Sequence, residues 1–236
     1  MDEPSVQVSL PVFPRSMRAA STLLGTLWLA EALLGRSGSS GGDPLGPFAW
    51  LALVPSRVAH GEVWRLLTHA LLHDPQGFAP VLWTVLSLWF FGGPMEARWG
   101  TRKLFTAMAA ATLAGALTVM LLGLLYVPFW AQRAYSPAAA TSMLAGAWGM
   151  AQGTRPMSFL GLVKLTGRQF AALTAALLAV GFLVSRSPES VLSLVGLLLG
   201  AVLGNTRPSA PKRSRRDSGP ALRVIRGGAS GSDLPN

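Results

Sequence analysis

The chain has 236 residues, of which 50% are hydrophobic and only 13% are charged, and its mean hydropathy is +0.42. An ordinary soluble domain carries about 25% charged residues, so the composition excludes that class and indicates a polytopic membrane protein. Cysteine is absent, which excludes disulfides and thiolate metal sites. The formal charge of +10 comes from basic residues in short loops and a tail, where they set membrane orientation, so we expect no nucleic-acid partner.

Apolar stretches long enough to cross a bilayer recur along the chain and predict an all-α fold of six membrane helices. These stretches are 19–35, 75–95, 104–132, 134–154, 169–185 and 190–206. Residues 1–18 are interpreted as a cytoplasmic leader and residues 19–206 as the membrane domain. Residues 207–236 are rich in Pro, Gly, Ser and Arg, which predicts a disordered basic tail. Glu31, about one turn from the end of its stretch, is expected to snorkel to the interface.

The segment from Gly61 to Lys103 organises the rest of the chain. Its first part has apolar residues at helical spacing, at positions 64, 67, 71 and 72, with polar residues between them. This pattern predicts an element lying in the headgroup region, in the loop between the first two membrane helices. Its last part, Gly92 to Gly100, is expected to break the helix and to leave Glu96 and Arg98 near lipid, where such charges need partners.

Small residues favour a close contact between the fourth and sixth stretches. Gly196, Gly200 and Gly204 form a GxxxGxxxG ridge, and Ala138, Ser142 and Gly146 form a small-residue stripe at the same spacing. We therefore expect the ridge and the stripe to meet at the centre of the bundle.

Two further segments connect the predicted helices. Residues 36–47 are predicted to be an aqueous linker, and residues 155–168 are predicted to be an amphipathic cytoplasmic connector.

Basic residues distribute unequally between the loops on the two sides of the six predicted helices. Fifteen of the 20 Lys and Arg residues lie on the side that also holds both termini, and five lie on the other side. The positive-inside rule then predicts that both termini are cytoplasmic. Frequent Ala, Gly, Leu and Arg suggest a GC-rich bacterial genome and hence the bacterial cytoplasmic membrane.

The motifs WRLLTHALLH, LWFFGG and ExRWGTRKL resemble the core of the rhomboid superfamily of intramembrane proteins, over about residues 50–205. The resemblance implies a six-helix rhomboid-like bundle. It also implies that Trp64-Arg65 and Glu96-x-Arg98 are scaffold residues of the structured loop between the first two helices.

Active rhomboids resemble serine hydrolases, with a Ser in a Gly-x-Ser-Gly turn of the fourth helix and a His in the sixth. A His and an Asn four residues apart on the second helix support the oxyanion. In this chain the second-helix positions hold Pro80 and Thr84, the only hydroxyls near the nucleophile position are Thr141 and Ser142, and Ser193 occupies the position of the base. The resemblance therefore implies that these positions are degenerate and that no catalytic residue remains.

The three histidines all precede the second stretch. His69 and His73 are four residues apart, as metal ligands on a helix can be, but no further His or acid at helical spacing completes a set, so we expect no metal and no other cofactor. We interpret both as part of a hydrated interfacial face. A dyad rebuilt from Ser142 and His73 would need the loop to reach into the bundle.

These observations favour a rhomboid-like pseudoprotease, similar to derlins, that resides in the lipid bilayer and binds a transmembrane-protein client without hydrolysing it. The alternative is an intramembrane serine-type endopeptidase with a displaced dyad. A small transporter would need paired charges within the membrane, and outside Glu31 the stretches contain none. The sequence indicates no oligomeric state.

Overall fold

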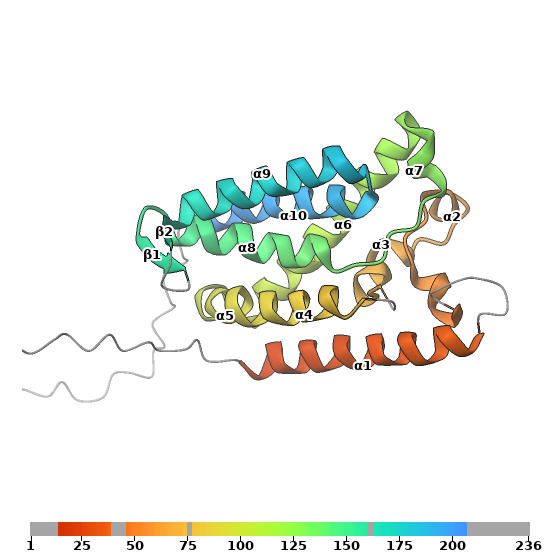
Figure 1. Cartoon of the computed structure of the whole chain (residues 1–236), viewed down its shortest axis with the longest axis horizontal. Coiled ribbons are helices and arrows are strands. Elements are labelled where there is room, and N and C mark those ends of the chain that lie inside the picture. The colour runs from red at the N-terminus through yellow and green to blue at the C-terminus, as the bar shows by residue number, and fades with distance from the viewer. Residues whose placement is uncertain (1–13, 39–45, 75–76, 160–162, 207–236) are drawn as a thin grey trace, which may run out of the picture.

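The computed structural model describes residues 14–38, 46–74, 77–159 and 163–206, which form a bundle of helices with one β-hairpin (Figure 1). Most of the predicted leader and the whole of the predicted tail lie outside the described residues. In chain order the elements are α1 (Arg15–Gly38), η1 (Gly46–Leu51), α2 (Pro55–Ala59), α3 (Arg65–Thr68), η2 (His69–Leu71), α4 (Phe78–Ser87), η3 (Leu88–Gly92), α5 (Gly93–Trp99), α6 (Thr101–Leu125), α7 (Val127–Ala131), α8 (Ala138–Gln152), β1 (Pro156–Phe159), β2 (Val163–Thr166), α9 (Gly167–Ser185) and α10 (Pro188–Gly204).

The first helix is longer than the predicted stretch 19–35. Pro14 has no N–H to donate but accepts the first helical hydrogen bond, from the Arg18 N–H at 3.0 Å, so α1 begins at Arg15. The last four residues of the predicted leader are therefore helical, and so are the first three of the predicted linker 36–47. The remainder of that linker consists of residues 39–45, which are outside the described residues, and the first two residues of the 3-10 helix η1.

The expected helix break after Gly92 is wrong. Residues Phe78–Trp99 form one continuous helical run of 22 residues through α4, η3 and α5. The middle piece, η3, is a π-helical turn that directly precedes the turn containing Pro94. Proline lacks an N–H and its ring clashes with the carbonyl four residues earlier, and the wider turn relieves both constraints without ending the helix.

The predicted connector 155–168 forms an antiparallel hairpin, so the all-α prediction needs a small correction. Strands β1 and β2 pair Pro156 with Thr166 and Phe159 with Val163. Apolar and polar residues alternate in MSF and VKL, which is the period of a strand and not that of an amphipathic helix. Thr166 then begins α9 with a capping box to Gln169.

Among the described residues, three helical runs are long and apolar enough to cross a membrane by themselves: Phe78–Trp99, Thr101–Leu125 and Gly167–Ser185. Helix α10 is apolar but has 17 residues, and α8 has 15. Large apolar side chains are exposed on the outer faces of the bundle, for example Leu121 of α6, Leu177 of α9 and Trp83 of α4. Such faces are typical of contact with lipid, since a soluble protein rarely exposes apolar surface of this extent.

Helix α8 lies at the centre, between α10, α6 and α9 on one side and α4 and η3 on the other (Figure 1). An ideal Cβ on Gly196, Gly200 or Gly204 would lie inside van der Waals contact with a backbone carbonyl of α8. Those carbonyls belong to three residues: Ala139, Met143 and Ala147. The ridge thus meets α8 as expected, but it contacts the residues one position after the predicted stripe. Gly146 of the predicted stripe also lies against α10, at the Leu197 backbone.

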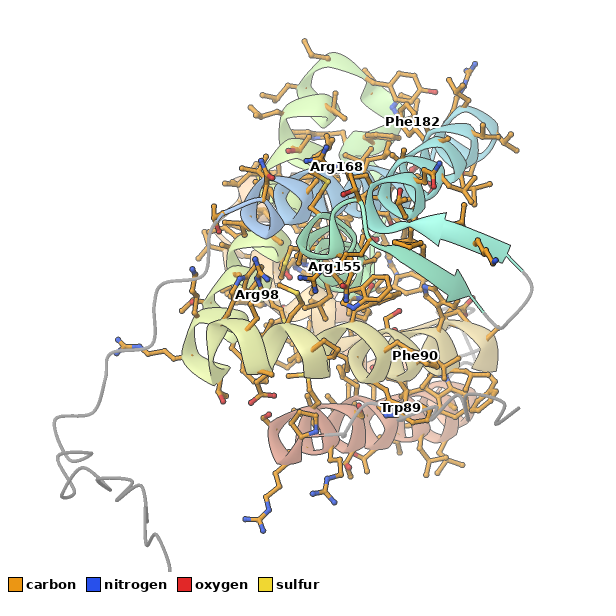
Figure 2. All side chains as sticks on the ribbon, turned by 90° about the vertical axis from the view of Figure 1, so that its left-hand side faces the viewer. Trp89, Phe90, Arg98, Arg155, Arg168 and Phe182 are labelled. Atoms are coloured by element: carbon orange, nitrogen blue, oxygen red, sulfur yellow. The ribbon has the colours of Figure 1, made fainter. Side chains whose placement is uncertain are left out.

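The two ends of the bundle differ. Figure 1 places the start of α1, the α5–α6 junction, the β1–β2 hairpin and the end of α10 at one end. Helices α2, α3 and α7 lie at the opposite end. We call these the hairpin end and the loop end. Figure 2, which faces the hairpin end, shows Arg98, Arg155 and Arg168 there.

The glycine contact gives a stability prediction. Gly200→Ala should lower the free energy of unfolding by about 1–3 kcal/mol, because the added methyl group meets the Met143 backbone, which cannot rotate away. Thermal unfolding in detergent micelles measures the change. Gly181→Ala is the matched control, since it is also a helical glycine but has no atom within 4 Å of the added Cβ. Equal stability of the two variants would contradict the proposed role of the contact.

Candidate functional site

A group of buried polar side chains lies where α1, α4 and the loop between them meet; we call the described residues 46–74 of this loop the interfacial loop. Glu31 of α1 and His73 of the loop are 0% and 1% exposed, and Thr84 of α4 is 4% exposed. The Glu31 Oε2 atom accepts a hydrogen bond from the His73 backbone N–H at 3.1 Å. The prediction that Glu31 snorkels is therefore wrong, because its carboxylate turns inward to a loop donor.

The indole of Trp28 adds a second link between α1 and the loop. Its Nε1–H donates to the Asp74 carbonyl oxygen at 3.1 Å. Trp28 and Glu31 are three residues apart, so they lie on neighbouring positions of one face of α1. Together they fix the end of the loop, just before α4 begins at Phe78.

Thr84 occupies one of the degenerate oxyanion positions, and it is the hydrogen-bond partner of His73. The His73 Nε2 and Thr84 Oγ1 atoms are 3.1 Å apart, and Thr84 Oγ1 also donates to the Pro80 carbonyl at 3.0 Å. A hydroxyl has one proton, so when that proton is given to Pro80 the Nε2 atom of His73 must carry the donor hydrogen. In this tautomer His73 holds Thr84 in place and offers it no base.

His69 is also buried, so the predicted hydrated face for His69 and His73 is wrong. The His69 Nδ1 atom lies 3.0 Å from the Arg65 carbonyl, and its Nε2 atom is buried without a hydrogen-bond partner in the described residues. The same is true of His73 Nδ1 and Glu31 Oε1. Desolvation lowers the pKa of His69 to about 4 and the pKa of His73 to about 4, so both rings are neutral at pH 7.

The other positions that the family uses for chemistry hold hydroxyls bonded to their own helices. Thr141 Oγ1 lies 3.2 Å from the carbonyls of Pro137 and Ala138, and Ser193 Oγ donates to the Glu189 carbonyl at 2.9 Å. Ser142, on α8, is half-buried. Within the described residues, none of these hydroxyls has a hydrogen bond to a histidine.

The scaffold of the loop is built on Arg65. Its Nε donates to Glu62, and its Nη1 donates to the carbonyls of Ala49 and Ala52 at 2.9 and 2.6 Å. Trp64 donates through Nε1 to the Trp50 carbonyl at 3.2 Å. These bonds satisfy carbonyls of η1 and of Ala52, the residue directly after it, so the Trp-Arg pair organises the loop.

The Glu-x-Arg motif does not belong to this loop, which corrects the expectation from the resemblance. Glu96 and Arg98 lie in α5, at the hairpin end of the bundle, because the helix continues to Trp99. Glu96 accepts hydrogen bonds from Ser16 of α1 and from Thr101, the latter at 2.6 Å. The Arg98 Nε atom is buried and has no partner among the described residues.

The described residues contain no cluster of three or more His, Asp or Glu side chains that could hold an ion. His69 and His73 lie in the loop, as the sequence predicts, but they are buried instead of hydrated. The signal that could have placed them is Glu31, since a carboxylate in an apolar stretch needs an inward partner.

The comparison with protein families agrees with this architecture. The family model described as "Eukaryotic integral membrane protein (DUF1751)" matches residues 19–203, which is most of the chain. The chain belongs to this DUF1751 family. As a member of a rhomboid-like family, it is an integral membrane protein of the rhomboid superfamily.

One curated relative of this DUF1751 protein is the rhomboid protease GlpG of Photorhabdus laumondii. The two are 35% identical over 65 residues, which cover 28% of this chain and 22% of the relative. The chain therefore matches about a fifth of the length of that protease. The protease activity in that name belongs to the relative, and the match supports the superfamily alone.

The buried histidines predict a pH-dependent stability. Their pKa values are about 4 in the folded protein and about 6.5 in the unfolded chain, so between these values the unfolded state binds more protons. Stability should be complete above pH 6.5 and should fall as the pH decreases toward 4. Melting temperatures in detergent at pH 7.5 and 5.0 measure this loss.

The double variant His69→Gln, His73→Gln tests whether the buried histidines cause this loss. The control is His60→Gln, because the side chain of His60 is exposed. The difference between pH 7.5 and 5.0 should shrink in the double variant and stay at the wild-type value in His60→Gln. If the double variant kept the full pH dependence, the buried histidines would not be its source.

Proposed function

We propose that this protein is a rhomboid-superfamily pseudoprotease that binds a transmembrane-protein client and leaves it uncut. The observation that carries the proposal is the state of the hydroxyls at the nucleophile and base positions. Thr141 and Ser193 are each bonded to carbonyls of their own helix, and α10 contains no histidine. A serine or threonine nucleophile needs a base within hydrogen-bond reach to take its proton.

The oxyanion positions support the same proposal. Pro80 has no N–H and no polar side chain, and the hydroxyl of Thr84 is occupied by Pro80 and His73. Loss of one oxyanion donor typically reduces the rate by about 10²–10³, and loss of the nucleophile or base reduces it further, although such losses do not multiply. The scaffold, by contrast, is fully bonded around Arg65. A retained scaffold without the catalyst fits a binding protein.

The alternative is an intramembrane serine-type endopeptidase with a displaced dyad. One observation favours it, namely the buried pair of His73 with the hydroxyl of Thr84, which replaces the Ser142–His73 pair considered from sequence. When the Thr84 hydroxyl donates to the Pro80 carbonyl, 3.0 Å away, its proton is not shared with His73, which argues against a base at this place. The alternative therefore requires His73 and Thr84 to exchange roles on substrate binding.

We also propose that the chain crosses the membrane six times, with both termini cytoplasmic. The passes would be α1, the run from α4 to α5, α6, α8, α9 and α10, and residues 1–18, 19–206 and 207–236 would be the leader, the membrane domain and the disordered tail. Support comes from Arg98, Arg155 and Arg168, which Figure 2 labels at the hairpin end, and from the excess of basic residues in the loops on the side of the two termini. For the compartment we propose the bacterial cytoplasmic membrane, which residue usage and the Photorhabdus relative favour, although the family's description names eukaryotes.

The orientation gives a direct test. Reporter fusions after Gly42 and after Pro208 should report opposite sides of the membrane, because an odd number of passes separates them in the proposed topology. Alkaline phosphatase and green fluorescent protein, which are active on opposite sides, make the readout independent of expression level. A shared side for the two fusions would end the six-pass proposal.

The function is tested with purified protein in liposomes. A fluorescent single-span model substrate should associate with the protein saturably, as measured by energy transfer, and should remain intact on gels because no base activates a hydroxyl. A serine-directed fluorophosphonate should leave the protein unlabelled.

Three variants sharpen this result: Thr84→Ala, Thr141→Ala and Ser142→Ala. Cleavage or labelling that one of them abolishes would overturn the pseudoprotease proposal and support the alternative. Absence of both cleavage and association would contradict the client-binding part of the proposal, and a structural role in the membrane would then remain.

A further inference from the structure

A polar pocket of about 440 Å³ lies at the loop end, between the interfacial loop and the segment that follows α7. The backbones of Leu53 and Ala134 join these two segments through hydrogen bonds of 2.8 and 2.9 Å. Helix α2 also contacts α7. The pocket wall includes the following residues: Trp50, Ser56, Arg57, Arg65, Ala131 and Arg133.

Three guanidinium groups line the pocket, and one carboxylate offsets them in part. Glu62 accepts from Arg65 Nε and lies 3.7 Å from Arg57 Nη1. The Glu62 carboxylate thus lies against two of the three guanidinium groups, those of Arg57 and Arg65. Arg65 is held by loop carbonyls and its side chain is 8% exposed, whereas the side chain of Arg57 is 66% exposed. One arginine is thus fixed in advance and another can adjust to a ligand.

The surroundings place the pocket at the depth of lipid headgroups. Trp50 and Trp64 are 57% and 45% exposed, and Tyr126, before α7, is 42% exposed, which is the aromatic belt expected at a membrane interface. Helix α7 supplies Ala131 to the pocket wall and also carries Val127, which is 79% exposed. The same helix therefore borders both the charged pocket and the apolar surface that faces acyl chains.

We propose that this pocket binds the phosphate of an anionic phospholipid headgroup of the phosphatidylglycerol class. A phosphodiester carries one negative charge and acceptor oxygens that match the planar donor fork of arginine. A phospholipid can place this group between Arg57 and Arg133 while its acyl chains lie along the α6–α7 corner. The proposal is independent of whether the protein cuts, since no pocket residue belongs to the positions discussed for catalysis.

The test compares binding of fluorescent phosphatidylglycerol and phosphatidylcholine by the purified full chain in nonionic detergent. The wild type should prefer phosphatidylglycerol. The double variant Arg57→Gln, Arg133→Gln should bind that lipid with an affinity lower by about fivefold for each charge removed. Phosphatidylcholine binding should not change. Arg65 is left intact because it holds the loop, and should the double variant not fold, Arg57→Gln alone provides the fivefold test.

Arg155→Gln with Arg168→Gln is the matched control, since both side chains are exposed arginines at the hairpin end (Figure 2). Its lipid preference should equal that of the wild type. Equal loss in the control would mean that net charge alone attracts the lipid, and an unchanged double variant would mean that the pocket does not bind it. Either result overturns the proposal.

A competition experiment separates the lipid from a free anion. Inorganic phosphate in the millimolar range, at constant ionic strength, should leave bound phosphatidylglycerol in place, because the acyl chains contribute to binding. Displacement of the lipid by inorganic phosphate would show a site for soluble anions and would overturn the assignment to a lipid.

Discussion

The close approach of α8 and α10 is the contact on which the rest of the bundle depends. Within a bilayer, lipid tails are as apolar as leucine side chains, so burial alone does not drive helices together and packing at short range must do so. Gly196, Gly200 and Gly204 present no Cβ to α8, and three turns of the two backbones therefore touch. Neighbouring helices use the same device: α6 approaches through Gly115, and α9 approaches through Gly167 against Gly149.

Helix α1 is attached by different chemistry. Only three of its described side chains, Met17, Ser21 and Glu31, are buried, and Met17 belongs to the same core cluster as Leu88 and Leu144. Polar bonds add to this apolar contact, from Ser16 to Glu96 at the hairpin end and from Trp28 and Glu31 to the loop at the other. Such bonds are worth about 1–2 kcal/mol or less within a membrane, and they depend on geometry more than on contact area. A few specific bonds at its two ends, together with the apolar contact of Met17, therefore set the position of α1.

Sequence patterns predicted the helices of this fold and its central contact, and failed where tertiary contacts decide. The period and the length of the apolar stretches suffice to predict the helices, and glycines at every fourth position predict that another helix packs closely against them. Glu31, a carboxylate in an apolar stretch, signals an inward partner, but the identity of that partner could not be derived, since it is a backbone N–H that only the folded loop presents. The contacts that bury His69 and His73 likewise depend on the fold of the loop. The bonds of Thr141 and Ser193 to their own helices also depend on rotamers that the sequence leaves open.

The π turn of residues 88–92 has an evolutionary consequence. A π turn contains one residue more than the α turn it replaces, so it is equivalent to a single-residue insertion absorbed by a helix. Removal of that residue would rotate everything beyond it by about 100° relative to α4. Glu96 would then face away from Ser16, and α1 would lose its bond at the hairpin end. Gene lineages of this protein should therefore tolerate substitutions within residues 88–92 far better than deletions there.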